Sequence, residues 1–210
     1  MKKILTLALA SVFLFACGGG DAEGEGGGSA KGTTFEMTNT HAPLDKFEKK
    51  SSTAFKSGMN WNGTKFQPVL YVAVSNMDKI EYNKMWANVK QPENEGEVII
   101  IFQFSGKRFD KGTEPTDLEA GDYGVGGDFM NGDMGCKAQV YMKGSAADLM
   151  MQSATRGDDF SGKAKITNLT KDLVEGEIEM TGKDGTKVTV KFSEKIEQDY
   201  WESEFKGGKA

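Results

Sequence analysis

The chain has 210 residues, of which 26 are basic and 31 acidic, so its formal net charge at neutral pH is −5. An acidic surface repels the phosphate backbone, which excludes nucleic acid as an expected partner and disfavours electrostatic attachment to anionic lipid headgroups. The length fits one ordinary domain with an attached segment, and the two cysteines are too few for a disulfide-stapled fold.

The N-terminus has the features of a bacterial export signal. Two lysines precede an apolar run over residues 4–15, which is too short for a transmembrane helix because such a helix needs about 20 residues. Residues 14–17 (LFAC) resemble the bacterial lipobox, which has Leu three positions before its cysteine and a small residue directly before it. The resemblance implies cleavage after Ala16 and a diacylglycerol on the sulfur of Cys17. The alternative is an ordinary A-x-A cleavage site, which Leu14 fits poorly.

This maturation predicts three parts: a signal peptide over 1–16, a lipidated cysteine with a tether over 17–32, and a single β-rich domain over 33–210. The mature chain would have 194 residues and a net charge of −7, because the two lysines of the signal are removed. Glycine makes up eight of the fifteen residues after Cys17, and none of the others is large and apolar, so this segment should be a flexible tether. Gly18 stands where Asp would resemble an inner-membrane retention signal, which favours the outer membrane as the destination.

Beyond the tether the pattern is mostly that of β-strands. The runs at 69–74 (VLYVAV) and 97–104 (EVIIIFQF) are apolar on both parities, which predicts central strands covered on both faces. Residues 137–143 alternate, as expected for a half-buried antiparallel strand with its even-numbered side chains inward. A turn at Asn62 and Gly63 is expected to join two further strand segments.

The helical signal is weak. Residues 43–56 predict one short helix because four side chains fall roughly on one helical face: Leu44, Phe47, Ser51 and Phe55. Residues 145–148 (SAAD) resemble a helix start, while residues 149–151 could equally form an edge strand.

A hairpin over residues 174–192 is the most sharply determined element. Both of its strands alternate, and their apolar sets must lie on one sheet face. A two-residue loop at Asp184 and Gly185 would break this rule, whereas a three-residue loop over 183–185 satisfies it and places Gly185 where a left-handed residue is needed. The predicted register has four pairs: Met180 with Val188, Ile178 with Val190, Glu177 with Lys191, and Gly176 with Phe192.

These elements predict an all-β domain. We expect an antiparallel β-sandwich or a partly closed barrel of about eight to ten short strands, with at most one or two short helices. A ligand-holding barrel gives the same sequence pattern as a sandwich, so both alternatives stay open.

The C-terminal half contains a series of short strands with turn glycines: residues 120–123 (AGDY), 138–141 (AQVY), 161–167 (SGKAKIT), 174–178 (VEGEI) and 188–192 (VTVKF). This series, after a lipobox, resembles a broad family of uncharacterised bacterial lipoproteins over about 75 residues. The resemblance implies a β-rich envelope protein and supplies no catalytic residues.

Few side chains suggest chemistry. His41 is the only histidine, and it has neither a nucleophile-elbow motif nor a second histidine to complete a zinc site. Met130, Met134 and Cys136 form a sulfur cluster that could select Cu(I), but strand parity points Cys136 into the core, where a free cysteine is a small hydrophobe. Core packing is therefore expected, with copper binding as the alternative.

Two other groups are weaker still. Residues 126–133 (GGDFMNGD) offer oxygen ligands, but Met130 stands where an EF-hand loop needs Asp or Asn, so a solvated turn is expected. Aromatic residues of a β domain usually lie in the core, and Tyr200 and Trp201, within the acidic stretch 197–204, are the candidate partner contacts. The glutamates of the hairpin identify no glycosidase site.

The expected protein is a lipid-anchored cell-envelope lipoprotein, bound to the membrane through Cys17 and facing the periplasm or the cell surface. Its β domain would have a non-enzymatic binding or structural role toward an unknown protein or small molecule, with no catalytic residue, metal or cofactor. The alternative is a lipocalin-like carrier of a small apolar ligand. An apolar cavity above about 300 Å³ would favour the carrier, and a filled core would favour the binding or structural role.

Overall fold

The structure is a computed structural model, and it describes residues 32–38, 44–83, 88–125, 134–143, 145–148, 160–183 and 185–201. These residues form one short 3₁₀ turn, η1 (Leu44–Lys46), and strands only. The strands are β1 (Thr34–Thr38), β2 (Ser51–Trp61), β3 (Lys65–Ser75), β4 (Tyr82–Asn83), β5 (Asn88–Val89), β6 (Val98–Ser105), β7 (Phe109–Asp110), β8 (Gly121–Val125), β9 (Gly135–Met142), β10 (Ser145–Asp148), β11 (Phe160–Leu169), β12 (Leu173–Gly182) and β13 (Lys187–Asp199). The all-β prediction is confirmed.

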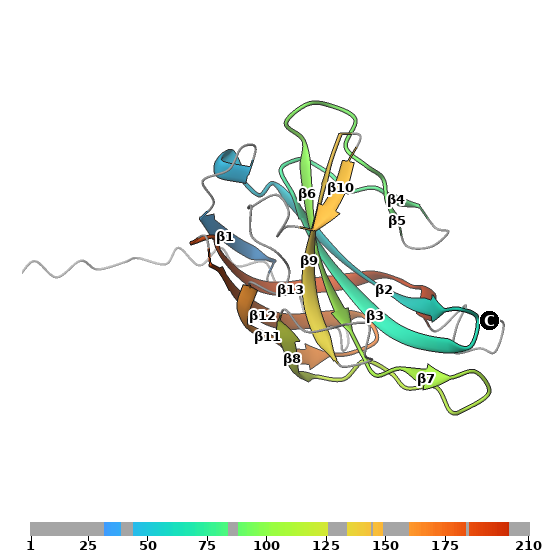
Figure 1. Cartoon of the computed structure of the whole chain (residues 1–210). Coiled ribbons are helices and arrows are strands. Elements are labelled where there is room, and N and C mark those ends of the chain that lie inside the picture. The colour runs from blue at the N-terminus through green and yellow to red at the C-terminus, as the bar shows by residue number, and fades with distance from the viewer. Residues whose placement is uncertain are drawn as a thin grey trace, which may run out of the picture.

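Eight of these strands form a closed barrel (Figure 1). They pair in the order β13-β12-β11-β8-β9-β6-β3-β2, and β2 returns to β13 to close the ring. Of the two predicted alternatives the barrel is therefore the one adopted, and it is closed rather than partly closed. The β13–β2 and β8–β9 pairs are parallel, so the antiparallel prediction is wrong at these two places. Alternation along a strand fixes which side chains face inward, and it carries no information on the direction of a neighbour that is distant in sequence.

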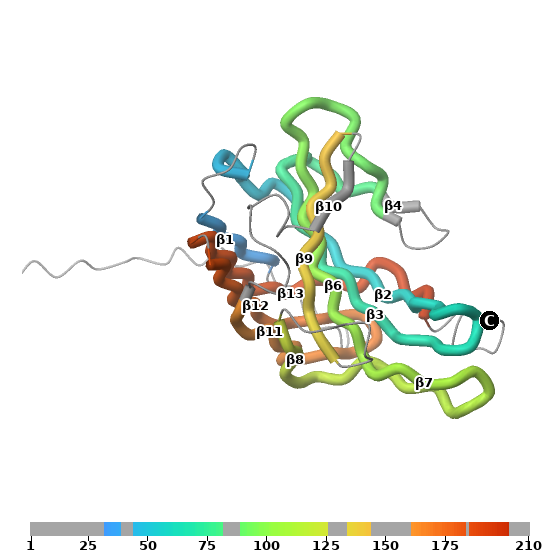
Figure 2. Tube along the Cα trace, in the orientation of Figure 1, coloured from blue at the N-terminus to red at the C-terminus, as the bar shows by residue number. Residues whose placement is uncertain are grey.

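Smaller strands extend the barrel at its margins. β1 pairs with β13, β10 with β9 and β7 with β3, while β4 and β5 form a separate two-stranded sheet. The β2–β3 hairpin and β7 extend together to one side of the barrel, and β4, β5 and β10 lie together at another end of the molecule (Figures 1 and 2).

The interior of the barrel is packed with apolar side chains. All eight ring strands contribute buried residues to a single cluster, from Ala54 of β2 to Ile196 of β13. Aromatic rings lie at its centre: the ring of Phe104 is 5.3 Å from that of Tyr123 and 5.6 Å from that of Phe192, between centroids. The ring of Phe35, on β1, lies next to that of Phe102, with 6.4 Å between the two centroids.

A second apolar layer covers the outer face of one side of the barrel. Its buried residues are Phe55 of β2, Ala73 of β3, Ile99 and Ile101 of β6, and three residues from outside the ring: Ile80, Val89 and Tyr200. All eight residues of β6 are consequently buried, and in β3 only Tyr71 and the first residue, Lys65, are not. This confirms the prediction that both apolar runs are central strands covered on two faces.

The predicted hairpin is confirmed in register and in loop length. β12 and β13 pair Met180 with Val188 and Ile178 with Val190. Gly182 donates its backbone N–H to the carbonyl of Thr186, which leaves the predicted three residues in the loop, and Gly185 has a φ of +88°. The pairs of Glu177 with Lys191 and Gly176 with Phe192 are also as predicted.

The turn at Asn62 and Gly63 is confirmed as well. Both residues have positive φ, at 56° and 72°, and Thr64 donates its backbone N–H to the carbonyl of Trp61. The side-chain oxygen of Asn60 accepts from the N–H of Gly63, which adds a local contact within the turn. The two strands that this turn joins, β2 and β3, are eleven residues long each.

Both helix predictions are wrong. Within 43–56 only η1 is helical, and β2 begins at Ser51. The helical spacing is misleading because Leu44 packs into the interior cluster, whereas Phe55 belongs to the outer layer. Residues 145–148 form β10, an antiparallel partner of β9, so cross-strand pairing overrides the local helix-start pattern. Residues 149–151 lie outside the described residues.

Candidate ligand site at one end of the barrel

Several sequence candidates lie outside the described residues. These are Cys17 and the tether up to residue 31, His41, and the loop 126–133 with Met130. Within the described part of the chain, no three His, Cys, Asp or Glu residues come together in a way that could hold a metal ion. In the same residues, no helix is long and apolar enough to cross a membrane.

Cys136 lies inside the barrel, as strand parity predicts. Its side chain is fully buried in the interior cluster, and Met134 packs against that cluster from the preceding residues. Burial raises the pKa of the Cys136 thiol well above its usual value, because the thiolate would lose its hydration. A thiol held neutral in this way is a poor metal ligand and a poor nucleophile.

Tyr200 and Trp201 are buried rather than displayed. Their exposed fractions are 8 % and 1 %, so neither side chain is presented to a partner as the sequence-based candidate pair requires. Tyr200 belongs to the outer apolar layer. The Trp201 ring packs edge-on against Phe109 of β7, with 5.7 Å between centroids. Both residues follow β13 directly, and they cover the outside of the barrel where β13 ends.

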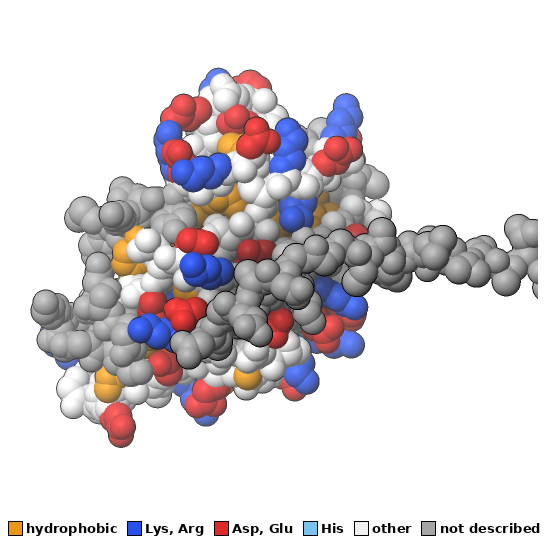
Figure 3. Space-filling view, turned by 180° about the vertical axis from the view of Figure 1, so that it is seen from behind, with side chains coloured by type: hydrophobic (Ala, Val, Ile, Leu, Met, Phe, Trp, Pro, Cys, Tyr) orange, Lys and Arg blue, Asp and Glu red, His pale blue; other side chains and the backbone are white. Residues whose placement is uncertain are grey.

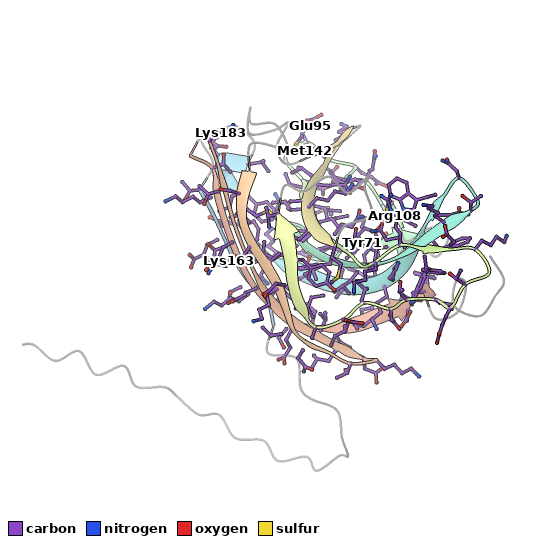
Figure 4. The ribbon with its side chains drawn as sticks, turned by 60° about the horizontal axis from the view of Figure 1, so that its bottom comes forward. Tyr71, Glu95, Arg108, Met142, Lys163 and Lys183 are labelled. Atoms are coloured by element: carbon purple, nitrogen blue, oxygen red, sulfur yellow. The ribbon has the colours of Figure 1, made fainter. Side chains whose placement is uncertain are left out.

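A buried polar group lies on the same outer face, near β7. The Gln67 amide, which is fully buried, donates to the carbonyl of Gly106 at 2.7 Å and accepts from the Trp61 indole at 3.1 Å. The guanidinium of Arg108 lies 3.8 Å from the centre of the Trp61 ring. Figure 4 shows Arg108 and Tyr71 on this side of the molecule and Lys163, on β11, pointing outward on the other. These contacts fix the segment before β7 on the outer face of the barrel.

One cavity lined by described residues lies where the middle of β2, the end of β13 and the β11–β12 turn meet. Its volume is about 670 Å³. Four charged residues and three others line it: Lys56, Asp199, Asp117, Lys171, Leu118, Leu169 and Thr170. Two further cavities are smaller, at about 410 Å³ beside Gly32 and β12 and about 150 Å³ beside Lys90. The volume of the first cavity falls within the range of about 300–1,000 Å³ that is typical of small-molecule sites.

Lys56 is the unusual side chain of this cavity. It lies on the same face of β2 as the interior residue Ala54, and its side chain is only 9 % exposed. Its ammonium is 3.7 Å from the carboxylate of Asp199, whose side chain is 21 % exposed. That separation is an ion pair but is longer than a hydrogen bond. Among the described residues, this ion pair is the one charged contact found for the ammonium.

Local backbone contacts hold the walls of the cavity. In the β11–β12 turn, Thr170 donates its N–H to the carbonyl of Leu173, and Ile196 of β13 donates to the carbonyl of Asp172 at 2.8 Å. On the opposite wall, the Asp117 carboxylate accepts the N–H of Leu118, whose side chain is buried in the interior cluster. The backbone that carries the charged groups is therefore held in place, and the buried side chain of Leu118 lies beside them.

Another carboxylate, on β13, is satisfied within the fold. Glu194 accepts hydrogen bonds from the hydroxyls of Thr33 and Ser52, the latter at 2.6 Å. Gly32 also donates its N–H to the carbonyl of Ser193, so the start of β1 is fixed beside this strand. Glu194 consequently ties three distant parts of the chain together and has a structural part.

Sequence reasoning missed the cavity because its residues come from four separate segments. Lys56 was grouped with a helix rather than with β2, and Asp199 stood in an acidic stretch without a distinguishing pattern. The one usable signal was the lysine itself, which interrupts a run of small and apolar residues at 53–57 (TAFKS).

Comparison with known proteins gives no further assignment: no family model, no curated protein and no solved structure matches the chain.

Proposed function

We propose that this protein is a lipid-anchored lipoprotein of the cell envelope whose β-barrel domain has a non-enzymatic binding role. The observation that carries the role is the packed interior, to which all eight ring strands contribute. A barrel that is filled by its own side chains has no room for a large apolar cargo, so its partners meet its ends and its outside.

The anchor is supported by the order of features along the sequence. A short apolar segment, a lipobox-like LFAC at 14–17 and a Gly-rich segment precede the barrel. A diacylated cysteine with a tether of this length would hold the barrel near the membrane while leaving its surfaces accessible. The favoured location is the outer membrane.

The distribution of charge on the surface is compatible with a water-exposed domain on a tether. Positive and negative side chains are interspersed on the face shown in Figure 3, rather than gathered by sign. Such a surface disfavours nucleic acid and non-specific attachment to lipid headgroups, and it leaves recognition to local sites.

The lipocalin-like carrier is a second candidate, favoured by the closed eight-stranded barrel itself. The rings of Phe102, Phe104 and Phe192 fill the space that a carrier would reserve for its ligand, and all three side chains are buried. We therefore place the carrier second.

The anchor is tested by intact mass and detergent partitioning of protein extracted from a bacterial host. We expect the wild-type protein to start at Cys17, to carry acyl mass and to enter the detergent phase. The variant Cys17→Ser should lack the acyl mass and stay in the aqueous phase, because the thiol is the acylated atom. The matched control is Cys136→Ser, which removes the other cysteine and should leave acylation unchanged. Wild-type protein without acyl mass would overturn the anchored lipoprotein.

A further inference from the structure

A nearly buried ammonium with a single charged partner among the described residues borders the cavity at the end of the barrel. The Lys56 ammonium is nearly buried, yet the only contact of its charge with a described residue is Asp199, at 3.7 Å. A buried ammonium has three donors and is costly to desolvate unless acceptors satisfy them. Since its charge borders a cavity of about 670 Å³, an acceptor can reach it from there.

The described part of the lining is electrically balanced. Lys56 and Lys171 supply two positive charges, and Asp117 and Asp199 supply two negative ones. A ligand with a net charge would bring that charge beside like-charged groups at the same cavity, whereas a zwitterion meets a complementary group for each of its ends. A purely apolar ligand would instead desolvate the charged groups without replacing their hydrogen bonds.

The short distance between Lys56 and Asp199 restricts the class of ligand further. The Lys56 nitrogen and the Asp199 oxygen are 3.7 Å apart, so the complementary charges of a ligand must also be close neighbours. An α-amino acid carries its ammonium and carboxylate on one carbon, which meets this condition. Leu118 and Leu169, beside the charged pair, offer an apolar wall for an aliphatic side chain.

We propose that this cavity binds a small zwitterion with an aliphatic side chain, of the α-amino acid type. The ligand carboxylate accepts from the ammonium of Lys56, the ligand ammonium donates to Asp199, and the side chain packs on Leu118 and Leu169. Lys171, on the exposed turn at the rim, attracts the carboxylate as it enters. This assignment rests on the proposed binding role of the barrel and is independent of the lipid anchor.

The test is calorimetric titration of the full mature protein in detergent with L-leucine, N-acetyl-leucine and leucinamide. We expect saturable one-to-one binding of L-leucine and about tenfold or weaker binding of each blocked compound, because each lacks one of the two charges that the lining complements. Absence of saturable L-leucine binding would overturn the proposed ligand, and equal binding of the three compounds would overturn the zwitterion.

Variants locate the site. Lys56→Met keeps most of the unbranched side chain but removes the ammonium, and it should weaken L-leucine binding at least tenfold. Lys171→Gln lies on an exposed turn, should fold normally and should weaken binding about threefold to tenfold. The matched control is Lys65→Met, which removes a lysine that forms a comparable but exposed ion pair with Asp110, at 3.9 Å. L-leucine binding unchanged in Lys171→Gln and in folded Lys56→Met would place the ligand elsewhere.

These outcomes separate the inference from the proposed function. If the wild-type protein carries no acyl mass, the lipid anchor is contradicted, and the result of the L-leucine titrations is unaffected. Failure of L-leucine to bind a correctly acylated protein would remove the ligand and leave the anchored barrel.

Discussion

The two sides of the barrel differ in what lies against their outer faces. On β11, β12 and β13 the burial alternates, so one face packs inside and the other carries solvated charges. An ion pair between Lys163 and Glu179 lies on that exposed face, at 3.4 Å with side chains 77 % and 53 % exposed. On β2, β3 and β6 the outer face is covered by a second apolar layer.

This difference shows on which side of the barrel the sequence alone determines the register of a strand. On the exposed side a shift of one residue would bury charges, so alternation fixes both the strand and its register. On the covered side both faces are apolar, and a shift exchanges one apolar set for another. The covered side must therefore be aligned by its turn and by its neighbours rather than by polarity.

The largest effect is expected for Phe102→Ala, in the strand that is buried on both faces. Phe102 is completely buried in the interior cluster, and its removal should lower the free energy of unfolding by about 3–5 kcal/mol. Denaturant unfolding followed by tryptophan fluorescence measures this change. A loss below about 1 kcal/mol would mean that the interior is not packed around this ring.

A matched pair of outer-face substitutions tests the comparison itself. Ile101→Ala, on the covered side, should cost about 2–4 kcal/mol because its side chain is 3 % exposed. Glu179→Ala, on the exposed side, should change stability by no more than about 0.5 kcal/mol, since a solvated ion pair contributes little. Similar costs for the two variants would show that the outer layer does not cover β6.

The turn of the exposed hairpin should give a smaller change. Gly185 has a φ of +88°, so Gly185→Val should lower stability by roughly 1–2 kcal/mol although no atom lies near the place of its Cβ. Gly185→Asn is the control, because Asn tolerates the left-handed region better. Equal stability of the Val and Asn variants would mean that backbone conformation is not what selects glycine at this position.

Alkaline pH tests the interior that both sides share. Burial raises the pKa of the Cys136 thiol, so its proton is retained in the folded state when the unfolded chain has already lost it. Stability should fall as the pH rises above about 8.5, by up to about 1.4 kcal/mol per pH unit, and this slope should be absent from Cys136→Ala. Parallel pH profiles for the two proteins, measured by urea unfolding between pH 7 and about 9.5, would indicate that the thiol is solvated.

Much of the fold follows from polarity, and the exceptions have specific causes. The register of β12 with β13, the inward position of Cys136 and the turn at Asn62 and Gly63 depend on local parity or turn chemistry, and each is confirmed. The parallel closure of β13 on β2 depends on residues about 140 positions apart, for which a single sequence contains no pairing signal.

The candidate site was less predictable than the fold. Lys56 and Asp199 form their ion pair only because β2 and β13 close the barrel, and neither residue has a motif around it. Tyr200 and Trp201 were the candidate partner contacts, and both side chains are buried. Tyr200 packs in the outer apolar layer of the covered side, and the Trp201 ring packs against Phe109 of β7.

Binding of an apolar fluorescent probe tests most directly whether the barrel is filled. Titration of 1-aminoanthracene into the full chain carrying Cys17→Ser, which has no lipid of its own, should give no saturable increase in emission. Phe102, Phe104 and Phe192 are buried in the interior cluster, so we expect no binding space for the probe there. Saturable one-to-one binding that a long-chain fatty acid displaces would contradict the filled barrel and make the protein an apolar-ligand carrier.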